Sequence, residues 1–122
     1  MSNPWCCLLF RYGEERSVPT CGEVATAVEE LYEEHLPGMT EGAYEEHGAA
    51  SLRYGYDEGP MYVLEITCHG TARWEEWADQ DYEIKLCPMV EVKSLPEEKA
   101  VLLWEQLAAG EPDVVRAYFR AI

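Results

Sequence analysis

The residues from Ala50 to Val92 alternate between apolar and polar side chains, and this alternation constrains the fold more than any other feature of the sequence. Successive side chains on a strand point to opposite faces, so a period of two predicts strands with one apolar face. Turn residues interrupt the alternation at Asp57–Pro60, Gly70–Thr71 and Asp79–Asp81. The segment is therefore expected to form an antiparallel meander with strands over about residues 50–56, 62–68, 72–78 and 82–92.

Pro88 lies within the last of these expected strands. Proline has no N–H to donate to a neighbouring strand, so it is confined to the edges and bends of a sheet. We therefore expect the strand over residues 82–92 to lie at an edge of the sheet or to bend at Pro88.

The segment Trp5–Phe10 is apolar at every position. A strand with two apolar faces is covered on both sides, so this segment is expected to form a central strand or an interface strand. A chain of 122 residues has helices enough for one face of a sheet. The sequence therefore predicts a homodimer.

A first helix is predicted from about residue 21 to residue 35. It begins at Thr20-Cys21-Gly22-Glu23, which has the spacing of a capping box. Apolar residues then recur every three or four positions, while glutamates occupy the other face. Pro37 ends the helix because proline cannot continue it, and residues 38–50, which lack periodicity, are expected to form a loop.

Two further helices are predicted near the C-terminus. Ser94-Leu95-Pro96-Glu97 combines a capping residue, a proline in the first turn and a carboxylate three residues after the serine. The helix that follows is expected to run to about Ala109, and Gly110 suits its C-terminal end. A short last helix is predicted over about residues 114–122.

These elements follow in the order βαββββαα. The predicted fold class is α+β, with a single antiparallel sheet and the helices packed on one of its faces. The sequence holds no internal repeat or low-complexity segment, so residues 1–122 are expected to form one domain.

The formal net charge is −15, from 24 acidic and 9 basic side chains. This charge argues against binding to nucleic acid phosphates or to an anionic membrane, and it favours a basic protein as partner. Trp5–Phe10 is too short for a membrane span and has no basic residue before it, so it does not resemble a signal peptide. A cytoplasmic protein is expected.

Five cysteines, at positions 6, 7, 21, 68 and 87, make an odd count without the spacing of a disulfide framework. We expect reduced thiols that pack as small apolar side chains. The alternative is a metal site at Cys68 and His69 with Cys87 one strand away, but paired ligands at short spacing are absent. The sequence therefore predicts no metal and no cofactor.

The alternation also predicts a polar sheet face opposite the helices, with Glu65, His69 and Glu83 on it. Trp74 and Trp77 point to opposite sides of one strand, so one of them joins this face. An acidic surface with an aromatic ring and a histidine suits a partner-binding site, because aromatic anchors supply much of the energy at interfaces. The alternative is a solvated face with cross-strand ion pairs.

No catalytic residue is predicted. The sequence lacks a nucleophile with its base, a glycine-rich phosphate loop and a metal triad at recognisable spacing. Glu65 and His69 share a strand face but lie about 13 Å apart, too far for direct contact. His35 is expected to pack on a helix stripe, and His47 lies in the expected loop without an inferable partner.

The layout resembles small bacterial accessory proteins, namely the immunity proteins of toxin systems and the products of mobile gene cassettes. The resemblance rests on the acidic balance, the strand, helix and meander order, the segment from Ser94 to Ala100, and Gly110-Glu111-Pro112. It covers most of the chain as a pattern without a diagnostic motif. It implies a protein that binds and blocks a partner.

The sequence thus leads to two functional hypotheses. The first is a non-catalytic binding or inhibitory protein that uses the acidic sheet face. The second is a small-ligand-binding or enzymatic domain with a pocket between the helices and the sheet. A deep cavity that converges on His69, Glu65 and a cysteine would favour the second hypothesis, and a closed core with an open acidic sheet face would favour the first.

Overall fold

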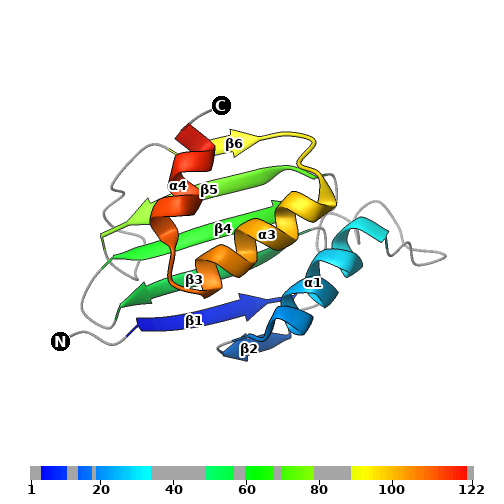
Figure 1. Ribbon diagram of the computed structural model, residues 1–122, viewed down its shortest axis with the longest axis horizontal. Coiled ribbons are helices and arrows are strands. Elements are labelled where there is room, and N and C mark those ends of the chain that lie inside the picture. The colour runs from blue at the N-terminus through cyan, green and yellow to red at the C-terminus, as the bar shows by residue number, and fades with distance from the viewer. Residues whose placement is uncertain are drawn as a thin grey trace.

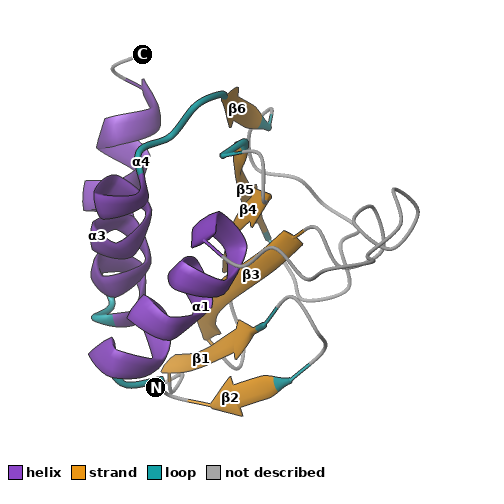
Figure 2. Ribbon diagram, turned by 90° about the vertical axis from the view of Figure 1, so that its right-hand side faces the viewer, coloured by secondary structure: helices purple, strands orange, loops and turns teal. Residues whose placement is uncertain are grey.

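The computed structural model describes residues 4–10, 14–17, 19–33, 49–56, 60–67, 70–78 and 89–120. These residues form one six-stranded antiparallel sheet in the order β2-β1-β3-β4-β5-β6. The described helices lie on one face of the sheet, as Figures 1 and 2 show. The predicted α+β class with a single antiparallel sheet is confirmed.

The element bounds follow the predicted order with one addition. The strands are β1 (Pro4–Leu9), β2 (Glu15–Ser17), β3 (Ala49–Tyr56), β4 (Met61–Thr67), β5 (Ala72–Trp77) and β6 (Val90–Val92). The helices are α1 (Cys21–Glu33), α3 (Glu97–Ala108) and α4 (Pro112–Arg120). The addition is β2, whose three residues, Glu-Arg-Ser, carry no apolar alternation that could have predicted it.

The meander from β3 to β6 pairs as predicted, and β6 lies at an edge of the sheet. Within the described residues, β6 spans three of the positions predicted for the last strand. The remainder of that prediction, Pro88 included, lies outside the described residues, as does most of the loop expected over residues 38–50.

One row of side chains crosses the sheet on the face beneath the helices. Leu8, Leu52, Leu64 and Trp74 occupy equivalent positions on four neighbouring strands, and all four are buried. α3 packs over this row, and its Trp104 donates an indole N–H to the backbone carbonyl of Leu64 at 3.0 Å. The apolar strand face and the apolar helix stripes therefore close one core.

β1 lies between β2 and β3, as an interior strand. Cys6 and Leu8 point into the core, whereas Trp5, Cys7 and Leu9 on the other face are half-buried. The homodimer that this strand suggested stays a prediction, because the structure holds one chain.

Among the described helices, none has the length and apolar character required to cross a membrane.

α1 begins at the predicted capping box. The Thr20 hydroxyl accepts the backbone N–H of Glu23 at 3.1 Å, and the Glu23 carboxylate accepts the backbone N–H of Thr20 at 3.0 Å. Both partners of the motif are therefore satisfied, which fixes the first turn of the helix. Tyr32, at the other end of α1, donates its hydroxyl to the carbonyl of Leu95 at 2.8 Å, so the helix is tied to the connection between β6 and α3.

The N-cap of α3 lies two residues after the predicted cap. Pro96 occupies the N-cap position without a side-chain cap hydrogen bond, so the assignment of Ser94 as the cap was wrong. Ser94 instead adopts a left-handed conformation with φ of 58°, which turns the chain so that Leu95 enters the core and donates its N–H to the carbonyl of Gly70 at 2.9 Å.

Gly110 ends α3 as predicted. Its φ is 83°, which glycine adopts without the steric cost of a side chain. The N–H of Gly110 bonds to the carbonyl of Leu107, and the N–H of Glu111 bonds to the carbonyl of Gln106, each at 3.0 Å. This is the Schellman arrangement, and it directs the chain back across the sheet as α4.

The capping box makes a specific prediction for stability. Replacing Thr20 with Ala should lower the free energy of unfolding by about 1 kcal/mol, because the N–H of Glu23 loses its acceptor. Urea denaturation measures the change. Thr26→Ala is the matched control, since Thr26 is exposed on the same helix and bonds only to the carbonyl of Gly22. Equal losses in the two variants would contradict a capping role for Thr20.

Candidate functional site

The sheet face away from the helices, here called the second sheet face, is formed by the side chains that alternate with those of the core. Its charged residues within the described strands are Glu15, Arg53, Glu65, Arg73, Glu75 and Glu91. Its large apolar residues are Trp5, Leu9, Met61, Val63 and Trp77. The face therefore combines carboxylates with aromatic rings, as the alternation predicted.

A three-strand ion cluster lies at one end of the second sheet face. Arg73 on β5 donates to the Glu65 carboxylate on β4 at 3.4 Å and to the Glu91 carboxylate on β6 at 3.1 Å. The side chains of Glu65, Arg73 and Glu91 are 37%, 44% and 33% exposed. Exposed ion pairs of this kind contribute little to stability. Because the carboxylates of Glu65 and Glu91 are partly exposed, another molecule can contact them.

Two members of the predicted site, His69 and Glu83, lie outside the described residues. The structure therefore brings Glu65 together with Arg73 and Glu91, and it leaves the proposed roles of His69 and Glu83 as predictions.

The two tryptophans of β5 lie on opposite sides of the sheet, and the outward one is Trp77. Trp74 is buried beneath α4, where it stacks against Tyr62 at 6.0 Å and against Phe119 at 5.9 Å between ring centroids. A partner cannot reach this ring, so Trp74 does not belong to the site. Trp77 is half-buried on the second sheet face, opposite Met61 of β4.

Trp5 is a second aromatic residue of this face that the sequence analysis did not assign to the site. Its ring lies over Gly55 of β3, where an added Cβ would approach the ring to 2.8 Å. Gly55 and the buried Met61 follow in the same row of the sheet, with Trp77 at the end of the row. The sequence could not assign Trp5 to the site, because its position opposite Gly55 depends on the pairing of β1 with β3.

A buried ion pair joins α4 to the sheet on the opposite face. The guanidinium of Arg116 donates to both carboxylate oxygens of Glu76, at 2.7 to 3.0 Å, and the indole N–H of Trp74 donates to the same carboxylate at 3.0 Å. The hydrogen bonds to Glu76 raise the pKa of Arg116, so its charge is fixed. The pairing joins residues forty positions apart, and no local pattern predicts it.

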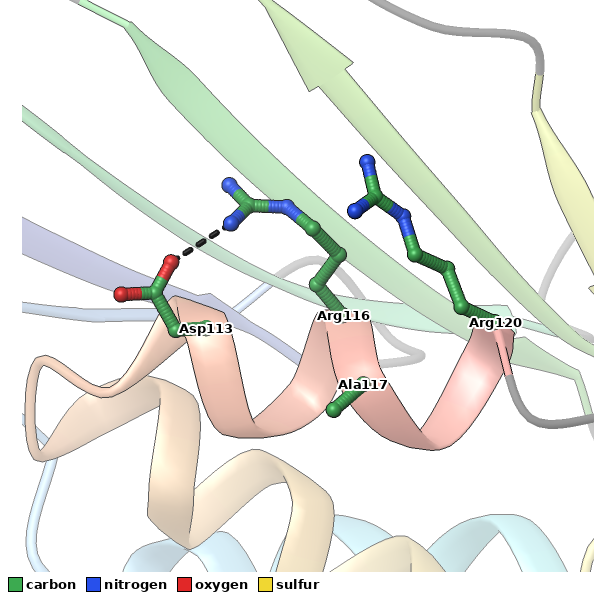
Figure 3. Close-up of a pocket in the computed structure, with 4 residues that line it drawn as sticks. All are labelled: Asp113, Arg116, Ala117 and Arg120. Atoms are coloured by element: carbon green, nitrogen blue, oxygen red, sulfur yellow. Dashed lines mark hydrogen bonds and ion pairs between the residues drawn. The ribbon is translucent and has the colours of Figure 1, made fainter.

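A hollow of about 500 Å³ beside α4 is lined by Asp113, Arg116, Ala117 and Arg120. Figure 3 shows the two guanidinium groups extending from the same side of the helix. Arg116 is committed to Glu76 and Asp113, while Arg120 pairs with no described residue. The carboxylates of Asp113 and Glu76 balance the charges of Arg116 and Arg120. The hollow therefore lacks the excess positive charge that would hold an anion.

The three described cysteines are free thiols: Cys6 is buried, Cys7 is half-buried and Cys21 is exposed. Burial raises the pKa of the Cys6 thiol to about 12, with a smaller effect from the neighbouring Cys7. Among the described residues, no group of three or more histidine, cysteine or acidic side chains is placed to hold a metal.

The space between the helices and the sheet is filled by side chains. Leu52, Leu64, Leu103, Trp104 and Leu107 are fully buried there and belong to one cluster. These side chains close the core in this part of the chain.

Comparisons with known proteins return no match: no protein-family model, no curated protein and no solved structure resembles this chain closely enough to be assigned.

Because Arg116 neutralises a buried carboxylate, its replacement should strongly reduce the stability of the fold. Replacing Arg116 with Met leaves the Glu76 carboxylate buried without its guanidinium, which should lower the free energy of unfolding by about 3 kcal/mol. The double variant Glu76→Gln/Arg116→Met should regain more than half of that loss, since the buried charge is gone and Trp74 keeps an acceptor. A single variant as stable as wild type in urea denaturation would contradict this account.

Buried thiol and phenol groups predict a loss of stability in alkali. Burial raises the pKa values of Cys6, Tyr32 and Tyr54 to about 12, from ordinary values of 9.0 for cysteine and 10.0 for tyrosine. The unfolded chain therefore releases these protons first, and the free energy of unfolding should fall as pH rises from about 9 to about 12. Denaturation at a series of pH values tests this, and Cys6→Ala should make the fall shallower near pH 9. A flat profile up to about pH 11 would refute it.

Proposed function

We propose that the protein is a non-catalytic binding or inhibitory module that engages a basic protein partner through the second sheet face. The observation that carries this proposal is the cluster of Glu65, Arg73 and Glu91, whose carboxylates remain partly exposed on three adjacent strands. Trp77 lies on the same face and supplies an aromatic contact.

Charge and aromatic side chains would have different roles in such a complex. A net charge of −15 speeds the encounter with a basic surface, and the effect weakens as salt screens it. A ring contributes to the lifetime of the complex after encounter. The half-buried Trp77 and Trp5 rings are the described candidates for that contact.

The resemblance to immunity and gene-cassette proteins supports a role in binding and blocking a toxin-like partner, with a cytoplasmic location as part of the same proposal. The comparisons neither add to this suggestion nor argue against it. An enzymatic role is less well supported, since the described residues contain a filled core and no nucleophile paired with a base.

The proposal is tested with immobilised protein and an extract of the native host. Partners captured by the wild type are identified, purified and used to measure the association rate at several ionic strengths. The rate should fall as salt rises, and Glu65→Lys should slow it about tenfold, because the substitution reverses a charge at the proposed contact.

Glu111→Lys is the matched control, since Glu111 is exposed beyond the end of α3 and changes the net charge by the same amount. It should slow association far less than Glu65→Lys does. Circular dichroism confirms that both variants fold. An unchanged set of partners with an unchanged rate for Glu65→Lys would refute the proposed face.

A further inference from the structure

The outward surface of α1 and α3 is the second strongly charged region of the molecule. The two helices pack side by side over one part of the sheet, as Figures 1 and 2 show. Together they carry seven glutamates and one lysine. We call the exposed residues of these two helices the α1–α3 face: Cys21, Gly22, Ala25, Thr26, Glu29, Glu98 and Leu102, with the half-buried Glu105 beside them.

The single lysine does not neutralise this face. The amine of Lys99 lies 4.5 Å from the ring centroid of Tyr118 on α4, so it is directed toward the neighbouring helix as a cation–π contact. The side-chain carboxylates of Glu29, Glu98 and Glu105 form no hydrogen bond or ion pair with any other residue in the described part of the chain. Their charges therefore remain available to a binding partner.

Leu102 gives the α1–α3 face an apolar centre. Its side chain is 42% exposed, although it is large and hydrophobic. Glu98 precedes it by four residues and Glu105 follows it by three, so the three side chains form one stripe along the outside of α3. Leu102 therefore offers an apolar contact between two carboxylates that pair with no described side chain.

We infer that the α1–α3 face binds a basic amphipathic helix of a protein partner. Such a helix carries an apolar side chain with lysine or arginine one turn to either side, which complements the carboxylate, leucine and carboxylate of the stripe in both charge and spacing. Repulsion excludes nucleic acid and anionic membrane at this face. The inference goes beyond the proposed function, because it concerns a different surface on the other side of the sheet.

Fluorescence anisotropy with a labelled amphipathic peptide of lysine, leucine and alanine tests the inference. The wild type should bind the peptide, and binding should weaken as salt rises. Leu102→Ser should weaken binding about tenfold without changing the salt dependence, because it removes an apolar contact and no charge. The double variant Glu98→Gln/Glu105→Gln should weaken binding and also reduce the salt dependence.

The matched control is Glu14→Gln/Glu111→Gln, which removes the same charge from exposed positions outside both acidic faces and should leave the affinity within about twofold. A peptide with glutamine in place of lysine should not bind. The inference would be overturned if the two double variants lost the same affinity for the peptide, or if Leu102→Ser left the affinity unchanged. Either result would show that net charge alone attracts the peptide. Absence of binding to wild type would overturn it as well. All the substituted residues are at least partly exposed, and thermal melting confirms that each variant folds.

Discussion

The buried row of Leu8, Leu52, Leu64 and Trp74 is the constraint on which the rest of the structure depends. It fixes the register of four strands at once, because a shift of one residue would exchange the two faces of the sheet. The helices close over this row, and Trp104 bonds to the backbone of Leu64 beneath it. Four charged residues of the second sheet face take their positions from the same register, namely Arg53, Glu65, Arg73 and Glu75.

Because apolar side chains fill the face beneath the helices, the charged residues lie mainly on the surface of the described part of the chain. The described core holds one buried charged residue, Glu76, and it is neutralised by Arg116. In the described part of the chain, two groups of exposed carboxylates lie on the second sheet face around Arg73 and on the helices α1 and α3. These two surfaces are the basis of the two binding proposals.

The sequence predicted most of the fold because its signals were local. Alternation identified the meander, the Thr20–Glu23 spacing identified the start of α1, and Gly110 identified the end of α3. It missed β2, whose three residues carry no pattern, and it placed the cap of α3 at Ser94. For the site, alternation placed Glu65 on the polar face, but only strand pairing distinguishes Trp74 from Trp77 or joins Glu76 to Arg116.

We propose that this protein binds its partner on its outer surfaces, outside the core that fills the described space between helices and sheet. Chemical-shift mapping of isotopically labelled protein with its purified partner distinguishes these two locations. The shifts should concentrate on Glu65, Arg73, Glu91 and Trp77, or on the exposed stripe of α3. Shifts concentrated on Leu64, Trp104 and the core around them would contradict it, because they would reveal an internal ligand site.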